Sequence, residues 1–243
     1  MPFLRILHAS YAIFLFGILF MMFFPLFLIP ILWKDRHDLV GTFNRWWARA
    51  FFTLGLFRYK VEKPSNLDPK QPYVFCPNHF SYLDIPAMGL NPVNAIFVGK
   101  NDMEKIPLFG YMYRKLHITV DRQSLKSRYT TVLKSIEAIE AGKSLVIFPE
   151  GGIVTDAPPK MGKFKDGAFR VAIEKQIPII PVTIPFNWII LPDGSYIPRW
   201  NLLKVVFHEP IATTGTTLDD VEKLKKQTYG IIDAELKRHN NEN

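Results

Sequence analysis

Cysteine is nearly absent from this sequence of 243 residues, and that scarcity removes several classes of chemistry. With Cys76 alone, neither an intrachain disulfide nor a cysteine-rich metal site can form. Cys76 ends an apolar run that begins at Tyr73, which favours a buried, inert thiol over a nucleophile. A Gly-x-Ser-x-Gly motif is also missing, so the sequence carries no sign of a hydrolase-type serine nucleophile.

Charged residues are missing between Arg5 and Lys34, a stretch dense in Phe, Leu, Ile and Met. About 20 apolar residues are enough for a helix to cross the hydrocarbon core of a bilayer. A signal peptide has a shorter apolar region followed by small residues, whereas this stretch ends in bulky ones. We therefore expect a retained membrane segment, with a cleaved signal peptide or a buried core helix as the alternatives.

A second apolar stretch covers residues 38–57. Its apolar side chains recur at helical spacing, as at Leu39, Phe43, Trp46, Ala50 and Leu54. Arg45 and Arg49 fall on another face, which suits a helix in the membrane interface, although packing against the rest of the protein explains the pattern equally well. Basic residues flank both stretches and leave the orientation open, so a hairpin dipping into one leaflet is also compatible. We expect residues 1–60 to form membrane-anchoring helices.

The remaining residues, 61–243, have the pattern of one α/β domain. Short β-rich runs lie at 73–76, 95–99, 118–120, 144–148, 179–184 and 204–208. Helical patterns lie at 107–116, 127–141, 167–175 and 218–237. This alternation predicts a mixed, partly parallel sheet flanked by helices.

The net charge of +8 indicates an anionic partner, such as nucleic acid, a phosphorylated metabolite or an acidic lipid headgroup. The aromatic residues gather in the apolar N-terminal segments and do not alternate with basic ones. That distribution argues against nucleic acid and in favour of a membrane surface.

The first string with chemical content is 77–84, Pro-Asn-His-Phe-Ser-Tyr-Leu-Asp, which directly follows the predicted strand 73–76. On one continuous helix, His79 and Asp84 would point about 140° apart. They can meet if His79 lies in the turn that leaves the strand and Asp84 lies in the first turn of the next helix. The carboxylate would then hold the imidazole in the tautomer whose other nitrogen can take a proton. Alternatively, Asp84 is a helix cap and His79 an ordinary turn residue.

The second string is 148–152, Phe-Pro-Glu-Gly-Gly, which ends the predicted strand 144–148. Glu150 therefore sits at the carboxyl end of a strand, where the ligand crevices of α/β sheets open. Gly151 and Gly152 would let the backbone approach a ligand closely, and their amides could face an oxyanion. An ordinary turn is the alternative.

Together these strings resemble the glycerolipid acyltransferases typified by 1-acylglycerol-3-phosphate acyltransferase. His79 and Asp84 match the His-x-x-x-x-Asp motif of that family, and residues 148–151 match its Phe-Pro-Glu-Gly. Further strings agree in order and spacing: Lys-Ile-Pro-Leu-Phe-Gly at 105–110, Asp-Arg at 121–122, Phe-Lys-Asp-Gly-Ala at 164–168 and Ile-Pro-Val at 180–182. The resemblance covers the region between residues 70 and 185.

The resemblance implies an enzyme that acylates the free hydroxyl of a lysophospholipid, most directly 1-acylglycerol-3-phosphate, to give phosphatidic acid. His79 would be the general base and Asp84 its orienting partner. The donor would be an acyl thioester of acyl carrier protein or coenzyme A, and neither an acyl-enzyme nor a further cofactor is implied. The expected location is the cytoplasmic face of the inner (plasma) membrane.

The resemblance also assigns the acceptor site. Lys105 and Arg122 would hold the acceptor phosphate, for which the fixed fork of arginine is well suited. Glu150 and Gly151 would shape the acceptor pocket. For Lys105 and Arg122 the alternative is ordinary solvated surface charge.

One departure from the family pattern concerns the acceptor. The family string continues Gly-Thr-Arg-Ser, whereas residues 151–154 read Gly-Gly-Ile-Val, so Ile153 stands where a cation is expected. Lys160, Lys163 and Lys165 follow closely and could supply the charge. Alternatively the acceptor is another lyso-lipid, such as a lyso-aminolipid.

Two rival classes of function use the same residues. A membrane-binding module without chemistry would keep the hydrophobic anchor and the basic body. A metal-dependent phosphatase would use His79, Asp84 and Glu150 as ligands, but the other histidines form no cluster with them in the sequence, and we expect no metal.

Overall fold

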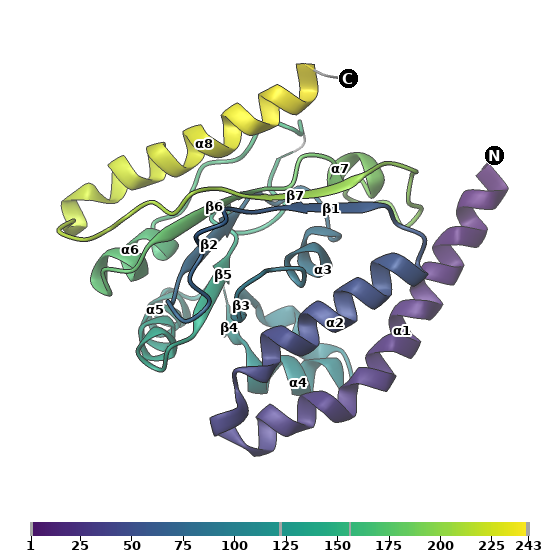
Figure 1. The fold of residues 1–243 in the computed structure, drawn as a ribbon, viewed down its shortest axis with the longest axis horizontal. Helices are drawn as coiled ribbons and strands as arrows, with labels where there is room; N and C mark the ends of the chain where they lie inside the picture. Colours follow the sequence, from purple (N-terminus) through teal and green to yellow (C-terminus); the bar gives the residue numbers. More distant parts are fainter. Residues whose placement is uncertain (1, 122, 156, 242–243) are drawn as a thin grey trace.

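The structure, a computed structural model, describes residues 2–121, 123–155 and 157–241 and is built around one seven-stranded sheet (Figure 1). The strands are β1 Tyr59–Glu62, β2 Val74–Pro77, β3 Ala95–Lys100, β4 Ile118–Val120, β5 Ser144–Ile147, β6 Ile179–Thr183 and β7 Leu203–Phe207. They lie in the order β1-β7-β6-β2-β5-β3-β4, and every neighbouring pair is parallel except β6 and β7. The predicted mixed, partly parallel sheet is confirmed.

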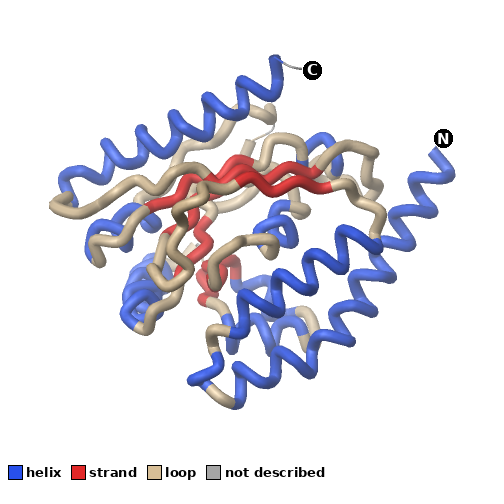
Figure 2. The backbone as a smooth tube through the Cα atoms, viewed as in Figure 1, coloured by secondary structure: helices blue, strands red, loops and turns tan. Residues whose placement is uncertain are grey.

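Helices cover both faces of this sheet (Figure 2). They are α1 Pro2–Leu32, α2 Leu39–Leu54, α3 Asp84–Met88, α4 Phe109–Leu116, α5 Leu125–Glu140, α6 Gly167–Glu174, α7 Asn187–Ile190 and α8 Val221–Asn241. Three short 3₁₀ turns join them: η1 Lys34–Arg36, η2 Asn101–Lys105 and η3 Leu218–Asp220. The helices predicted at 107–116, 127–141, 167–175 and 218–237 are confirmed as α4, α5, α6 and α8.

The two faces of the sheet are filled by alternate residues of the same strands. Val74 and Cys76 pack with α5, α6 and α8 on one face. Tyr73 and Phe75 pack with α1, α2, α3 and α7 on the other. The central strand β2 is buried along its whole length, as expected of a strand covered on both faces. Because β2 is held so firmly, the turn that leaves it has a fixed starting point.

Strand β1 was not predicted from the sequence. Its four residues are only partly buried and show no clear alternation of apolar and polar side chains. It forms because α2 delivers the chain to the edge of the sheet beside β7, where Tyr59 pairs with Leu203 and Glu62 with Val206. The predicted boundary between an anchor (1–60) and a catalytic domain (61–243) falls inside β1, and this division stays a prediction.

Helices α1 and α2 form a hairpin along one side of the sheet (Figure 1). Within the described chain, α1 is the helix long and apolar enough to cross a bilayer, judged by length and composition. Many of its large apolar side chains are exposed, including Phe3, Leu7, Phe14 and Met22. Its other side is buried against α2 and α4 around Phe27. One face of α1 thus belongs to the protein core, and the opposite face is suited to lipid.

Candidate active site

His79 lies in the turn that leaves β2, as predicted. β2 pairs with β5 in the parallel register Val74 to Leu145, a separation of 71 positions, and the same separation links His79 to Glu150 beyond the strand ends. The chain leaves β2 toward α3 on one face of the sheet and leaves β5 toward α6 on the other. Such a divergence opens a crevice at the carboxyl ends of parallel strands, where α/β proteins bind ligands.

The His79 imidazole and the Asp84 carboxylate form a buried hydrogen-bonded pair. His79 Nδ1 lies 3.0 Å from Asp84 Oδ2, and the same oxygen accepts from the amides of Phe80 (2.8 Å) and Ser81 (2.9 Å). Asp84 is the first residue of α3, but its side chain holds the turn before the helix rather than the helix amides that follow. The alternative of a simple helix cap is therefore wrong for Asp84.

This geometry defines which nitrogen of His79 can accept a proton. An ionised carboxylate has no hydrogen to donate, so Nδ1 must carry the proton in the His79–Asp84 bond. The Nε2 atom then has a free lone pair, and no described residue hydrogen-bonds to it. The imidazole also stacks on Phe148, with ring centroids 4.1 Å apart and planes at 26°. Its orientation is thus fixed from two sides, as a general base requires.

Asn187, at the start of α7, is a site residue that the sequence did not reveal. Its Nδ2 donates to Asp84 Oδ1 at 3.0 Å, so both carboxylate oxygens of Asp84 are held. The Asn187 side chain is fully buried, and its Oδ1 has no partner within the described chain. A lone Asn between Phe186 and Trp188 matches none of the motifs described above. Asn187 reaches the site because the chain that follows β6 comes back to Asp84.

Three further hydrogen bonds secure the turn at 77–84, called the catalytic turn below. The Asn78 side chain exchanges bonds with Ile184, donating to its carbonyl at 3.1 Å and accepting from its amide at 2.7 Å. Ser81 Oγ donates to the Leu191 carbonyl at 2.6 Å. All three bonds connect the turn to the segment after β6. The turn is therefore braced on the side away from β5 as well.

Glu150 also lies in the site, although its contacts are with backbone. Its Oε1 accepts from the His79 amide at 2.8 Å, and its Oε2 accepts from the Gly162 amide at 2.7 Å. Burial raises the pKa of this carboxyl to about 7, against the ordinary value of 4.5. Glu150 thus joins the catalytic turn to the segment around Gly162. This contact adds a positioning role to the predicted one of shaping the acceptor pocket.

Gly151 is covered by the side chain of Lys165. Gly151 has φ +79°, a conformation that favours glycine, and a Cβ built there would lie 2.5 Å from Lys165 Nζ. The Lys165 amide donates to the Pro149 carbonyl at 2.8 Å, which anchors the lysine beside the turn. No carboxylate of the described residues pairs with its ammonium group. An ammonium group without a described carboxylate partner therefore lies over the turn that contains Glu150. Ile153, which follows this turn, stands where the family pattern has a cation.

Lys105 and Arg122 are the residues predicted to bind the acceptor phosphate. Lys105 ends η2, with its side chain 82% exposed and its ammonium 3.4 Å from Asp102. No described contact joins it to His79 or Glu150. Arg122 lies outside the described residues. The assignment of both to the acceptor phosphate stays a prediction.

Two further points concern the Cys76 thiol and the ligands of a possible metal ion. Cys76 is fully buried, and burial raises the pKa of its thiol well above the ordinary range, so the thiolate nucleophile is disfavoured. Among the residues that the structure describes, no group of three His, Cys, Asp or Glu side chains is placed to hold a metal ion.

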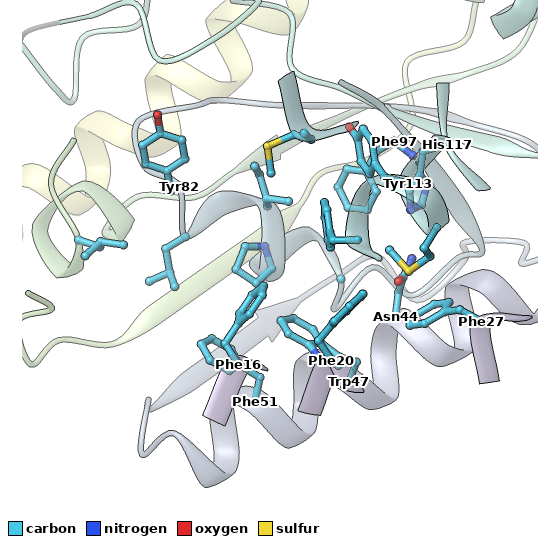
Figure 3. Close-up of a pocket in the computed structure, with 18 residues that line it drawn as sticks. Phe16, Phe20, Phe27, Asn44, Trp47, Phe51, Tyr82, Phe97, Tyr113 and His117 are labelled. Carbon is cyan, nitrogen blue, oxygen red and sulfur yellow. Dashed lines mark hydrogen bonds between the residues drawn. The ribbon is translucent and has the colours of Figure 1, made fainter. Parts of the chain in front are cut away.

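An apolar cavity of about 340 Å³ is lined in part by the chain neighbours of Asp84. Its wall includes Tyr82, Leu83, Ile85 and Pro86, which flank Asp84 on both sides in the chain. Figure 3 shows Phe16, Phe20, Trp47 and Phe51 on one side of the cavity, contributed by α1 and α2, with Phe97, Tyr113 and His117 opposite. Burial lowers the pKa of His117 to about 3, so the cavity holds no imidazolium at neutral pH. A hydrocarbon chain suits this lining.

Comparisons with known proteins identify the family and the fold of the chain. The Acyltransferase family model matches residues 58–185, which is more than half of the chain. A chloroplastic 1-acyl-sn-glycerol-3-phosphate acyltransferase of Brassica napus is 30% identical over 187 residues, covering 74% of this chain and 53% of the relative. The corresponding enzyme of Haemophilus influenzae is 28% identical over 204 residues, covering 81% of each chain.

A solved structure has the same fold. The crystal structure of the 1-acyl-sn-glycerophosphate acyltransferase PlsC from Thermotoga maritima matches with a TM-score of 0.81 and 21% identity, covering 99% of this chain and 98% of that one. The chain spans about half the length of the Brassica napus relative and of an Arabidopsis thaliana relative with 27% identity. Because the family model matches residues 58–185, this chain belongs to the Acyltransferase family.

Proposed function

We propose that this protein transfers a fatty acyl group from an acyl thioester to the free hydroxyl of a lysophospholipid, with His79 as general base. The observation that carries the proposal is the buried His79–Asp84 pair, in which Nε2 of His79 has no partner among the described residues. The chain neighbours of Asp84, Leu83 and Ile85, line an apolar cavity. The names of the relatives support the same reaction type.

The reaction needs no covalent enzyme intermediate. The acceptor hydroxyl gives its proton to His79 Nε2 while its oxygen bonds to the thioester carbonyl carbon. The tetrahedral intermediate then breaks its carbon–sulfur bond, and the imidazolium returns the proton to the leaving thiolate. Asp84 keeps the imidazole in one tautomer and stabilises the imidazolium between the two steps. Cys76 is too deeply buried to act as an alternative nucleophile.

The acceptor that fits best is 1-acylglycerol-3-phosphate, which gives phosphatidic acid. Its phosphate monoester needs a cation near the base, and Lys165, which lies over Gly151, can supply it in place of the arginine that Ile153 replaces. Lys105 and Arg122 are the other candidate ligands. If Lys165 serves another purpose, the loss of the arginine favours an acceptor without a phosphate monoester, such as a lyso-aminolipid.

The proposed location is a membrane surface at the cytoplasmic face of the inner membrane. The exposed apolar side chains of α1 support membrane association, and the net charge of +8 suits anionic lipid. Acyl carrier protein or coenzyme A would deliver the acyl thioester from the aqueous side.

The test is an acylation assay on the full chain purified in detergent. A panel of lyso-lipids with phosphate, zwitterionic and amino headgroups is assayed with both kinds of thioester donor. We expect His79→Ala to lower kcat by about 10³-fold or more. His208→Ala is the matched control, because His208 bonds Thr183 and has no described bond to His79, Asp84 or Glu150, and it should retain activity. Full activity of a folded His79→Ala variant would contradict the mechanism.

A further inference from the structure

A second apolar cavity, of about 220 Å³, adjoins the first. It runs along the N-terminal half of α1, where Ala9, Ala12 and Ile13 line it, and is closed by Tyr196 and Pro198. Its lining contains no charged side chain. A headgroup or a phosphate is therefore a poor occupant, and a hydrocarbon chain a good one.

The two cavities share one wall. Phe16, Phe51, Leu83 and Leu191 line both of them. From this wall the first cavity follows the C-terminal half of α1 toward α4, and the second follows the N-terminal half.

Two residues of the shared wall connect it to the catalytic turn. Leu83 directly precedes Asp84, and the Leu191 carbonyl accepts the 2.6 Å bond from Ser81 Oγ. The two cavities therefore meet next to the residue that holds His79.

The second cavity is held by polar contacts at its outer end. Arg5 Nε donates to the Pro198 carbonyl at 3.1 Å, and the His8 ring stacks on Trp200 at a centroid distance of 4.3 Å. These contacts tie the start of α1 to the segment that closes the cavity. At the rim, Ile13 is 63% exposed and Tyr196 is 81% exposed, beside the apolar surface of α1. A chain can therefore reach the second cavity directly from a lipid phase.

We propose that the second cavity binds the acyl chain already present on the lyso-lipid acceptor, while the first binds the chain that is transferred. The inference rests on the proposed function. The product of that reaction carries two hydrocarbon chains on one glycerol unit, so two chains must diverge from one reacting ester. The exposed rim along α1 assigns the second cavity to the chain of the substrate that resides in the membrane.

The experiment fills each cavity in turn. Ala12→Phe places a ring in the second cavity, and Met112→Trp, the matched variant, enlarges a side chain in the first. Each variant is assayed with palmitoyl and hexanoyl acceptors, and with palmitoyl and hexanoyl thioester donors. For Ala12→Phe we expect KM for the palmitoyl acceptor to rise by about tenfold, with KM for the hexanoyl acceptor and the donor preference unchanged. Met112→Trp should instead disfavour the palmitoyl donor and leave the acceptor preference unchanged.

The outcomes separate this inference from the proposed function. A wild-type chain that acylates no lyso-lipid overturns the proposed function. An active wild type whose Ala12→Phe variant loses both acceptors equally, or shifts its donor preference, overturns the two-cavity assignment. The smaller change Ala9→Leu repeats the test if Ala12→Phe lowers the thermal unfolding midpoint, and it should show the same selective effect on the palmitoyl acceptor.

Discussion

The two sides of the crevice, the catalytic turn at 77–84 and the segment that carries Glu150, Gly151 and Lys165, are held in different ways. On the first side, the Asp84 carboxylate accepts four hydrogen bonds, and the side chains involved are buried. On the second side, Glu150 binds two amides, but Lys165 extends over Gly151 with its side chain exposed. Proton transfer needs an orientation fixed in advance, whereas a charged headgroup can be met by a cation that moves. Changes on the two sides should therefore affect different kinetic constants.

The largest effect is expected from Asp84→Asn. The amide can present its NH₂ group to His79, which would force the proton onto Nε2 and remove the base. We expect kcat to fall by about 10²–10⁴-fold, with a small change in KM. Steady-state kinetics at several donor and acceptor concentrations measure both constants. If acceptor affinity fell while kcat was preserved, Asp84 would act in acceptor binding and not through His79.

Asn187→Ala tests whether the Asn187 amide, which bonds Asp84 Oδ1, supports catalysis rather than acceptor binding. Its loss leaves Asp84 Oδ1 without its 3.0 Å donor, so the carboxylate can rotate away from His79. We expect kcat to fall by about 10- to 100-fold at unchanged KM. Asn91→Ala is the control, because it removes another buried amide, one that bonds the Val93 amide and has no described bond to His79 or Asp84, and it should affect stability rather than kcat. Equal losses of kcat in the two variants would leave Asn187 with a purely structural role.

Lys165→Ala tests the acceptor side. If Lys165 meets the acceptor phosphate, its removal should raise KM for 1-acylglycerol-3-phosphate by about tenfold and leave kcat nearly unchanged. The same variant should acylate a lyso-lipid without a phosphate monoester as well as the wild type does. Lys163→Ala, two positions away, is the matched control. An unchanged KM for every acceptor would exclude Lys165 from headgroup recognition.

The smallest effect is expected on the pH dependence of stability through Glu150. Its pKa is about 7 in the folded chain and 4.5 ordinarily, so between these values the folded state binds more protons than the unfolded state. The contribution of Glu150 to the free energy of unfolding therefore falls as pH rises from about 4.5 to about 7. His37, whose pKa burial lowers to about 4, and His117 contribute slopes of the opposite sign.

The difference between wild type and Glu150→Gln isolates the slope that Glu150 contributes. The thermal unfolding midpoint of the wild type minus that of Glu150→Gln, measured by circular dichroism, should fall as pH rises from 4.5 to 7. Parallel pH profiles for the two proteins would show that folding does not raise the pKa of Glu150.

The sequence predicts those parts of the site that lie close to regular elements. The turn after β2 and the turn after β5 carry their side chains within a few residues of a buried apolar strand, so their position at the carboxyl edge follows from local pattern. Lys105 was assigned by resemblance alone, and the structure holds it on an exposed turn with Asp102. Strand β1 was missed because its burial depends on β7, which follows far later in the chain.

By itself, the sequence determined the alternation of strands and helices, the apolar character of α1, and the placement of His79 and Glu150 at strand ends. These are short-range properties, set by the spacing of apolar side chains and by turn residues. The tertiary structure alone decided that Asn187 meets Asp84 across 103 positions, that Lys165 covers Gly151, and that two cavities diverge from Leu83. Such contacts depend on the order of strands in the sheet and on how α1 packs against it, because both bring together residues that no local pattern connects.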